Sequence, residues 1–224
     1  MHYKVLADVI PLSVITVLVD YFNNNSHRHR TTNSMVKIDF PWTIPTIRDS
    51  LYNILNTYVD VDLPNLGDNL YKHNFPYFPH VDLENGYPCF NCLIPLLLSE
   101  NNPQHFVIFD QYVNDVNNGK TWLGNFSLEG NFEANKKRKF PFDDEIVENL
   151  TTENIDQDFY DSYLKYDYRD EQLFKGMTGV ATDYKPGNLI LFDSKYIHCT
   201  GKMNNSYKMG LSLRFKGKLS EALK

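Results

Sequence analysis

Short runs of alternating or continuously apolar residues follow one another along most of this chain, which is the pattern of β-strands. Turn signals such as Gly86-Tyr87-Pro88 and Pro186-Gly187 separate the runs. Many short strands divided by turns are typical of a β-sandwich or a barrel. The pattern predicts strands at Tyr3 to Ile10, Asn69 to Phe78, Phe90 to Leu98, His105 to Tyr112, Asn188 to Asp193 and Tyr207 to Lys216.

Two stretches near the start of the chain have helical spacing instead. Pro11 stands where a helix can begin, and apolar residues recur at helical intervals from Ser13 to Phe22. Ile47 to Tyr58 places its apolar residues on one helical face. We expect both helices to support the main sheet from outside.

A longer interval, Asn114 to Val180, interrupts the β pattern. It contains a basic cluster at Lys136 to Lys139 and helical patterns at Glu145 to Leu150 and Gln157 to Leu164. Because long segments in compact domains are commonly lids or binding elements, we expect an insertion at about 114–180 that covers a site.

The insertion offers aromatic walls and a cation for such a site, namely Tyr160, Tyr163, Tyr166, Tyr168 and Arg169. Two simpler interpretations stay open. The tyrosines could pack on the outside of the barrel, since aromatic stripes are more often core than site. The basic cluster could be a solvated charge run balanced by nearby acids, and otherwise a contact for phosphate or nucleic acid.

A length of 224 residues suits a single domain spanning 1–224. The net charge of -6 gives no overall positive field for sequence-independent nucleic-acid binding. Apolar Val14 to Val19 is too short for a membrane span and lacks the flanks of a signal peptide. Three cysteines are too few for a disulfide scaffold, so we expect a reducing compartment: the cytoplasm, or a host cytoplasm if the sequence is viral.

Three groups of possible metal ligands have ordinary structural interpretations. Cys89 and Cys92 form a CxxC, but a zinc site of that type needs two more ligands at similar spacing. The polar run that contains His27 to Arg30 is expected to be an exposed loop. His105 begins a predicted strand directly after a turn and is expected to be a surface histidine.

The strongest candidate site combines His80, Asp82 and His198. His80 and Asp82 are two residues apart, so their side chains share one face of an extended segment. His198 follows the strand at Asn188 to Asp193 and is predicted in a short polar loop. Two imidazoles and one carboxylate are the donor set of the facial triad of non-haem Fe(II) oxygenases, which leaves three coordination positions open.

A cationic strand follows this histidine. Lys208, Gly210, Ser212 and Arg214 lie on one face of the predicted strand Tyr207 to Lys216, because side chains alternate along a strand. Two cations therefore point the same way, downstream of His198.

The order of four features along the chain resembles that of the Fe(II)- and 2-oxoglutarate-dependent oxygenases. The features are an HxD motif, a long interval, a histidine after the apolar strand PGNLILFD, and a basic residue ten to sixteen positions after that histidine. The resemblance is specific over Phe75 to Leu98 and Tyr184 to Lys216. It implies a mainly β fold with supporting helices, the double-stranded β-helix or jelly-roll barrel. The chain is also similar to small oxygenases of marine phages and plankton.

The resemblance also implies roles for single residues. His80, Asp82 and His198 match the iron ligands, and Lys208 or Arg214 would anchor the far carboxylate of 2-oxoglutarate, with Ser212 between them. KMGLSLR is similar to the RxNxTxR-like strand of the alkylation-repair dioxygenases, in which two arginines serve the co-substrate. The lysine departs from that pattern, because it offers a point charge instead of a two-pronged donor.

An enzyme of this kind would use Fe(II), 2-oxoglutarate and dioxygen to hydroxylate a substrate, with release of succinate and CO2. Asp82 fills the position that a halide would need, which favours hydroxylation over halogenation. A small-molecule substrate is favoured, and a nucleobase or a protein side chain stays open. A non-enzymatic jelly-roll binding module is the alternative of another class, and the intact ligand triad argues against it.

Overall fold

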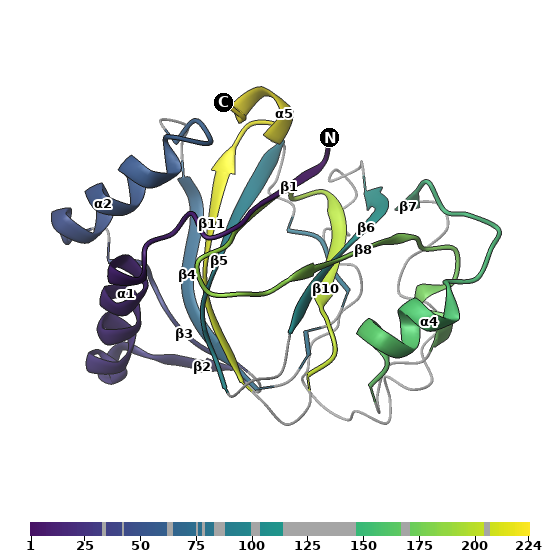
Figure 1. Cartoon of the computed structure of the whole chain (residues 1–224), viewed down its shortest axis with the longest axis horizontal. Helices are drawn as coiled ribbons and strands as arrows, with labels where there is room; N and C mark the ends of the chain where they lie inside the picture. The colour runs from purple at the N-terminus through teal and green to yellow at the C-terminus, as the bar shows by residue number, and fades with distance from the viewer. Residues whose placement is uncertain are drawn as a thin grey trace.

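Two antiparallel sheets pack face to face, with helices outside the larger one (Figure 1). The computed structural model describes residues 1–32, 35–41, 43–61, 65–74, 76–77, 79–82, 88–99, 104–113, 147–166, 171–203 and 207–224. Within these residues the larger sheet has seven strands, in the spatial order β1 (Tyr3–Leu6), β9 (Leu189–Asp193), β5 (Cys89–Leu98), β11 (Lys208–Lys216), β4 (Asn65–His73), β3 (Met35–Ile38) and β2 (Arg30–Thr32).

The smaller sheet has four strands among the described residues. β6 (His105–Val113) pairs with β10 (Tyr196–Thr200), β7 (Val147–Glu148) and β8 (Gly179–Asp183). The helical elements are α1 (Leu12–Asn24), η1 (Ser26–Arg28), α2 (Pro45–Leu55), α4 (Gln157–Phe159), the π-helical η2 (Tyr160–Leu164), η3 (Glu171–Phe174) and α5 (Leu219–Ala222). The expected mainly β, jelly-roll type of fold with supporting helices is confirmed.

β11 shows how the sequence builds the layers. Its odd-numbered residues join the core under the helices, where α1 contributes Ile15 and Leu18 and α2 contributes Leu51. Its even-numbered residues turn to the opposite face, toward the smaller sheet, because side chains alternate along a strand. The residues that β11 buries under the helices are Met209, Leu211, Leu213 and Phe215.

β6 has the same two-sided pattern in the smaller sheet. Phe106 and Ile108 face the larger sheet and pack with Phe192 of β9. Val107 and Phe109 face outward and pack beneath the helical elements of residues 157–174. The molecule thus has one apolar layer between the sheets and one on the outside of each sheet.

The predicted helices at Ser13 to Phe22 and Ile47 to Tyr58 are present, and Pro11 and Pro45 stand at their starts. The predicted strands are present with shifted ends, and the first is shorter than expected.

Three local predictions were wrong. Val147–Glu148, inside the expected helix at Glu145 to Leu150, forms strand β7, because pairing with β6 outweighs helical spacing in so short a segment. The segment around His27 to Arg30 is exposed at His27, Arg28 and Arg30 as expected, but it is not a loop throughout, because it contains η1 and the start of edge strand β2. His198 lies within strand β10, paired with β6, and not in a loop.

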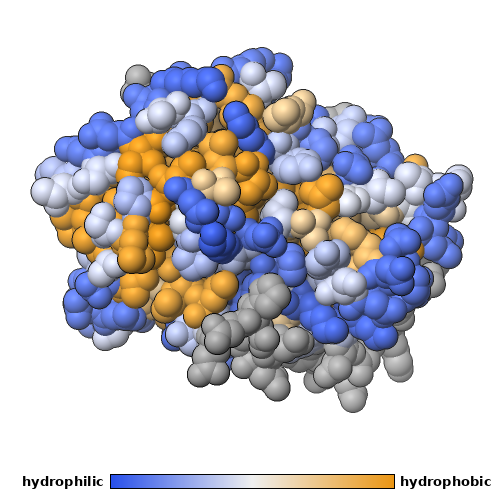
Figure 2. Space-filling model, viewed as in Figure 1, coloured by the Kyte–Doolittle hydropathy of each residue, from blue (hydrophilic) through white to orange (hydrophobic). Residues whose placement is uncertain are grey.

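Apolar surface gathers over the side of the molecule that carries α1 and α2 (Figure 2). α1 leaves Leu12 and Val17 exposed on its outer face. These helices lie on the outer face of the larger sheet, and the inner face of β11 lies on the opposite side of that sheet. Among the described residues, no helix has the length and apolar character that a membrane span requires.

Gly210 lies where two buried hydroxyls crowd against β11. The hydroxyls of Tyr71 and Tyr184 are 3.0 Å apart, and that of Tyr184 donates to the carbonyl of Met209 at 3.1 Å. A Cβ on Gly210 would lie 2.1 Å from the Tyr184 hydroxyl and 2.7 Å from the Tyr71 hydroxyl. No side chain fits there without moving both tyrosines.

We therefore expect Gly210→Ala to lower the free energy of unfolding by about 1–3 kcal/mol, the usual cost of overpacking. Gly67→Ala on the neighbouring strand β4 is the matched control, because a Cβ there meets no heavy atom within 4 Å. Chemical denaturation of both variants measures the difference. Adding Tyr184→Phe to Gly210→Ala should restore part of the loss. Equal stability of the two alanine variants would contradict this packing.

Candidate functional site

His80 and Asp82 follow β4 in a segment that pairs with β10. The amide of His80 donates to the carbonyl of His198 at 3.0 Å, and the amide of His198 donates back at 2.9 Å. The amide of Asp82 donates to the carbonyl of Ser194 at 2.9 Å. Val81 points outward into the core beneath the smaller sheet. His80 and Asp82 consequently point inward together, as their two-residue spacing predicts.

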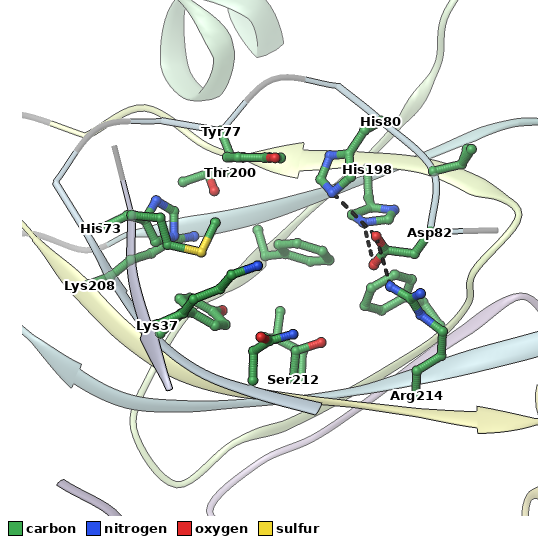
Figure 3. Close-up of a pocket in the computed structure, with 17 residues that line it drawn as sticks. Lys37, His73, Tyr77, His80, Asp82, His198, Thr200, Lys208, Ser212 and Arg214 are labelled. Atoms are coloured by element: carbon green, nitrogen blue, oxygen red, sulfur yellow. Dashed lines mark ion pairs between the residues drawn. The ribbon is translucent and has the colours of Figure 1, made fainter. Parts of the chain in front are cut away.

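These three residues form one cluster of possible metal ligands (Figure 3). One donor atom of each lies within 4.8 Å of the donors of the other two. Nε2 of His198 is 3.5 Å from Oδ2 of Asp82, and Nε2 of His80 is 3.8 Å from Oδ1. Two imidazole nitrogens and a carboxylate oxygen at this separation can converge on one first-row metal ion.

The surroundings of His198 fix its tautomer. Nδ1 lies 2.9 Å from the carbonyl oxygen of Tyr196, which can only accept, so Nδ1 carries the proton. This hydrogen bond holds the ring so that Nε2 faces Asp82, which is how a second hydrogen bond orients a histidine for metal binding. The ring is 2% exposed and packs against Phe106 and Phe192.

Asp82 is held by two side chains of the larger sheet. The side-chain amide of Asn91 donates to Oδ2 at 3.0 Å, and a guanidinium nitrogen of Arg214 lies 3.1 Å from Oδ1. Burial acts to raise the pKa of Asp82, but the charge of Arg214 and the contacts with His198 and His80 outweigh it and hold that pKa well below its usual range. Asp82 is therefore an anion whose lone pairs are already oriented.

A pocket of about 500 Å³ opens from this cluster between the sheets, a size that suits a small molecule. Its floor is the inner face of β11 and β4, where the register sets Lys208 beside His73 and Ser212 beside Asn69. Figure 3 places His80, Asp82, His198 and Arg214 at one end of the pocket and Lys208 and His73 at the other. The pocket thus has a metal-ligand end and a lysine end.

Lys208 and Arg214 occupy different electrostatic positions. Arg214 already pairs with Asp82 and also donates through Nε to Asn91 at 3.3 Å. Lys208 is 1% exposed, and its ammonium lies 4.2 Å from the centre of the Tyr184 ring, a cation–π contact. Burial raises the pKa of Tyr184, whose hydroxyl stays neutral beside the lysine. The two cations are not equivalent, which the sequence alone left open.

No protein-family model matches the sequence, and no curated protein matches it. Solved structures do match. The 2-oxoglutarate-dependent epimerase SnoN from nogalamycin biosynthesis aligns with TM-score 0.52 and 8% identity over 96% of this chain and 78% of its own. EvdO2 from Micromonospora carbonacea var. aurantiaca aligns with TM-score 0.51 and 11% identity over 97% and 86%. HygX from Streptomyces hygroscopicus, with nickel and 2-oxoglutarate bound, has TM-score 0.50 and 11% identity over 97% and 84%.

This chain has the jelly-roll fold of these structures. At this level of identity the likeness concerns the architecture, and reaction and substrate depend on the individual site. In this fold the His80, Asp82 and His198 cluster lies inside the jelly roll, between the two sheets.

Several pocket residues were not singled out from the sequence. Tyr71 and His73 were expected only as parts of strands, and Lys37 of β3 was not assigned at all. Asn91, which does not line the pocket but donates to Asp82, was also expected only as part of a strand. These residues can be identified only from the pairing register of neighbouring strands, and a single sequence does not give that register. Asn91 is opposite Arg214, and Lys37 is opposite Tyr71.

Other candidates lie away from the pocket. His105 stands 3.6 Å from Asp183 and packs edge-on against the ring of Tyr163, outside the ligand cluster. Cys89, Cys92 and Cys199 are free and buried, and among the described residues they join no metal-ligand group. Nε2 of His29 lies 2.9 Å from the backbone carbonyl of Phe22, a contact within the fold.

The aromatic residues of the expected insertion are only partly described. Tyr160 and Tyr163 belong to the packing outside the smaller sheet, where Tyr160 neighbours Phe174. Tyr168, Arg169 and the basic cluster at Lys136 to Lys139 lie outside the described residues. A lid over the pocket stays a prediction.

The support of Asp82 leads to a prediction for the metal-free protein. We expect Arg214→Met to lower the free energy of unfolding by about 1–3 kcal/mol, because it leaves a largely buried carboxylate without its ionic partner. Arg30→Met is the control, since Arg30 pairs with Asp39 at the surface, where both side chains are more than half exposed and such pairs contribute about 0–1 kcal/mol. Thermal and urea unfolding compare the two, and equal losses would contradict the role of Arg214.

Proposed function

We propose that this protein is an Fe(II)- and 2-oxoglutarate-dependent dioxygenase that hydroxylates a small molecule. The observation that carries the proposal is the convergence of His80, Asp82 and His198 inside a fold shared with 2-oxoglutarate-dependent enzymes. The donor set suits Fe(II), the Nδ1 hydrogen bond of His198 orients its Nε2 toward the cluster, and Asp82 is in the anionic form that binds a metal.

When bound, Fe(II) with 2-oxoglutarate and dioxygen supplies an oxidant for a C–H bond and releases succinate and CO2. His80, Asp82 and His198 would hold the metal on one side, which leaves the pocket side open. Arg214 and Asn91 keep Asp82 in place. Phe106 and Phe192 pack against the ring of His198 and exclude water from it.

Lys208 is the better candidate for the far carboxylate of 2-oxoglutarate. It lies at the end of the pocket opposite the ligand cluster, whereas Arg214 is engaged with Asp82 at the metal end. Ser212 lies between the two along β11 and offers a hydroxyl to the bound acid. A dianion stretched along β11 would therefore meet a metal at one end and an ammonium at the other.

Hydroxylation is one outcome of such chemistry, and the fold itself does not choose it. SnoN is named an epimerase, and a related structure, SnoK (TM-score 0.52), a carbocyclase. Incorporation of one oxygen atom from ¹⁸O₂ into the product would identify hydroxylation, and its absence with continued succinate release would favour epimerisation or cyclisation. Substrates on a nucleobase or a protein side chain remain alternatives of the same class.

The first test separates an enzyme from a binding module of the same fold. Anaerobic addition of Fe(II) and 2-oxoglutarate should give the weak visible charge-transfer band of a chelated keto acid. We expect Asp82→Ala and His198→Ala to abolish this band. Each should also lower metal affinity by more than the roughly 10–100-fold that is lost when a residue hydrogen-bonded to a metal ligand is removed. His105→Ala is the matched control and should keep the band. Absence of the charge-transfer band in the wild-type protein would contradict the proposed function.

The second test concerns the anchor of the co-substrate. Lys208→Ala should weaken 2-oxoglutarate binding by about 1.5–3 kcal/mol, the scale of a charge-assisted hydrogen bond, and leave metal affinity nearly unchanged. Calorimetric titration of the metal-loaded protein measures both affinities. If Lys208→Ala binds 2-oxoglutarate normally and Arg214→Met does not, the anchor is Arg214.

A further inference from the structure

Lys37 brings a third cation into the pocket from an edge region of the larger sheet. On β3 it is opposite Tyr71 of β4, and Tyr71 is opposite Gly210 of β11. The three residues form one row across neighbouring strands, on the face that turns to the pocket. Figure 3 shows the side chain of Lys37 pointing into the cavity between its two ends.

The charges of the pocket are unbalanced. Among the described lining residues, Lys37, Lys208 and Arg214 are cationic and Asp82 is the only carboxylate. The protein as a whole has a net charge of -6, so the positive charge is concentrated in this cavity. A low-dielectric cavity with charge of one sign attracts ligands of the other sign.

Ferrous iron and dianionic 2-oxoglutarate cancel each other and leave this excess in place. Arg214 is paired with Asp82, and the buried Lys208 lies at the end of the pocket that we assign to the co-substrate. Lys37 is half-buried, and among the described residues no carboxylate pairs with it. Asp39, two residues further along, pairs with Arg30 instead.

We propose that the prime substrate carries an anionic group, a carboxylate or a phosphate, and that Lys37 binds it. The inference rests on the proposed function, because it assigns Lys208 to 2-oxoglutarate and leaves Lys37 for the second ligand. Asn69 and Thr200 also line the pocket and can donate hydrogen bonds to such a group. A neutral analogue would leave the positive charge of the loaded pocket uncompensated, which makes Lys37 a determinant of specificity.

The test uses the full chain loaded with Zn(II), which supports no turnover, and saturated with 2-oxoglutarate so that the Lys208 end is occupied. Calorimetric titration with inorganic phosphate, acetate and neutral acetamide then probes the remaining cation. We expect one or both anions to bind and acetamide not to bind. Tighter binding of phosphate would indicate a phosphorylated substrate, and tighter binding of acetate a carboxylic acid.

Lys37→Ala should weaken anion binding at least about tenfold, the scale of one charge-assisted hydrogen bond, and Lys37→Arg should retain most of it. Affinity for 2-oxoglutarate should change less than about twofold in Lys37→Ala, in contrast to Lys208→Ala. Lys4→Ala is the matched control, because Lys4 is a half-buried lysine of the same sheet that does not line the pocket.

Three results would overturn the inference. Anions could fail to bind the loaded wild type, or bind Lys37→Ala as tightly as the wild type. A tenfold loss of 2-oxoglutarate affinity in Lys37→Ala would place Lys37 in the co-substrate site instead. A wild type that binds no 2-oxoglutarate at all would overturn the proposed function together with the inference, and this outcome is distinguishable because it precedes the anion titration.

Discussion

Two backbone hydrogen bonds between His80 and His198 determine the geometry of the site. They attach the segment after β4 to the smaller sheet, and the two-residue period of extended chain then turns Asp82 inward. Asp82 in turn meets Asn91 and Arg214, which belong to the larger sheet. The possible metal ligands therefore come from one sheet and the groups that orient the carboxylate come from the other. The pocket therefore lies beside Asp82, whose backbone pairs with the smaller sheet and whose carboxylate contacts the larger sheet.

The local periodicity of the sequence accounts for much of this arrangement. It predicts the two helices that start at proline, most of the strands, and the shared face of His80 and Asp82, because each depends on residues close together in the chain. It does not predict Lys37 beside the pocket or Asn91 beside Asp82, since strand register is set by pairing between distant segments. β7 was missed for a related reason, because a two-residue strand has no periodicity of its own.

The electrostatics of the cavity oppose those of the whole chain. An acidic protein with its cations concentrated in one recess attracts small anions to that recess and repels them from the rest of its surface. Salt screens these electrostatic interactions more strongly at the surface than inside the recess. The architecture contributes the recess and not the chemistry, as shown by an epimerase and a carbocyclase with the same fold. The proposed selectivity toward a substrate would therefore depend on the side chains of β3, β4 and β11 that face the cavity.

The position of β11 has a consequence for the order of assembly. It lies in the middle of the larger sheet, between β5 and β4, yet it follows every other described strand in the chain. During synthesis β4 and β5 have no partner between them until this segment leaves the ribosome, and their unpaired edges stay open to other chains. Contacts between segments so distant in sequence form slowly, because the entropy of closing a large loop is lost before the strand pairing stabilises the structure. The larger sheet can thus be completed only late, and a nascent chain stalled before residue 208 leaves the facing edges of β4 and β5 unpaired.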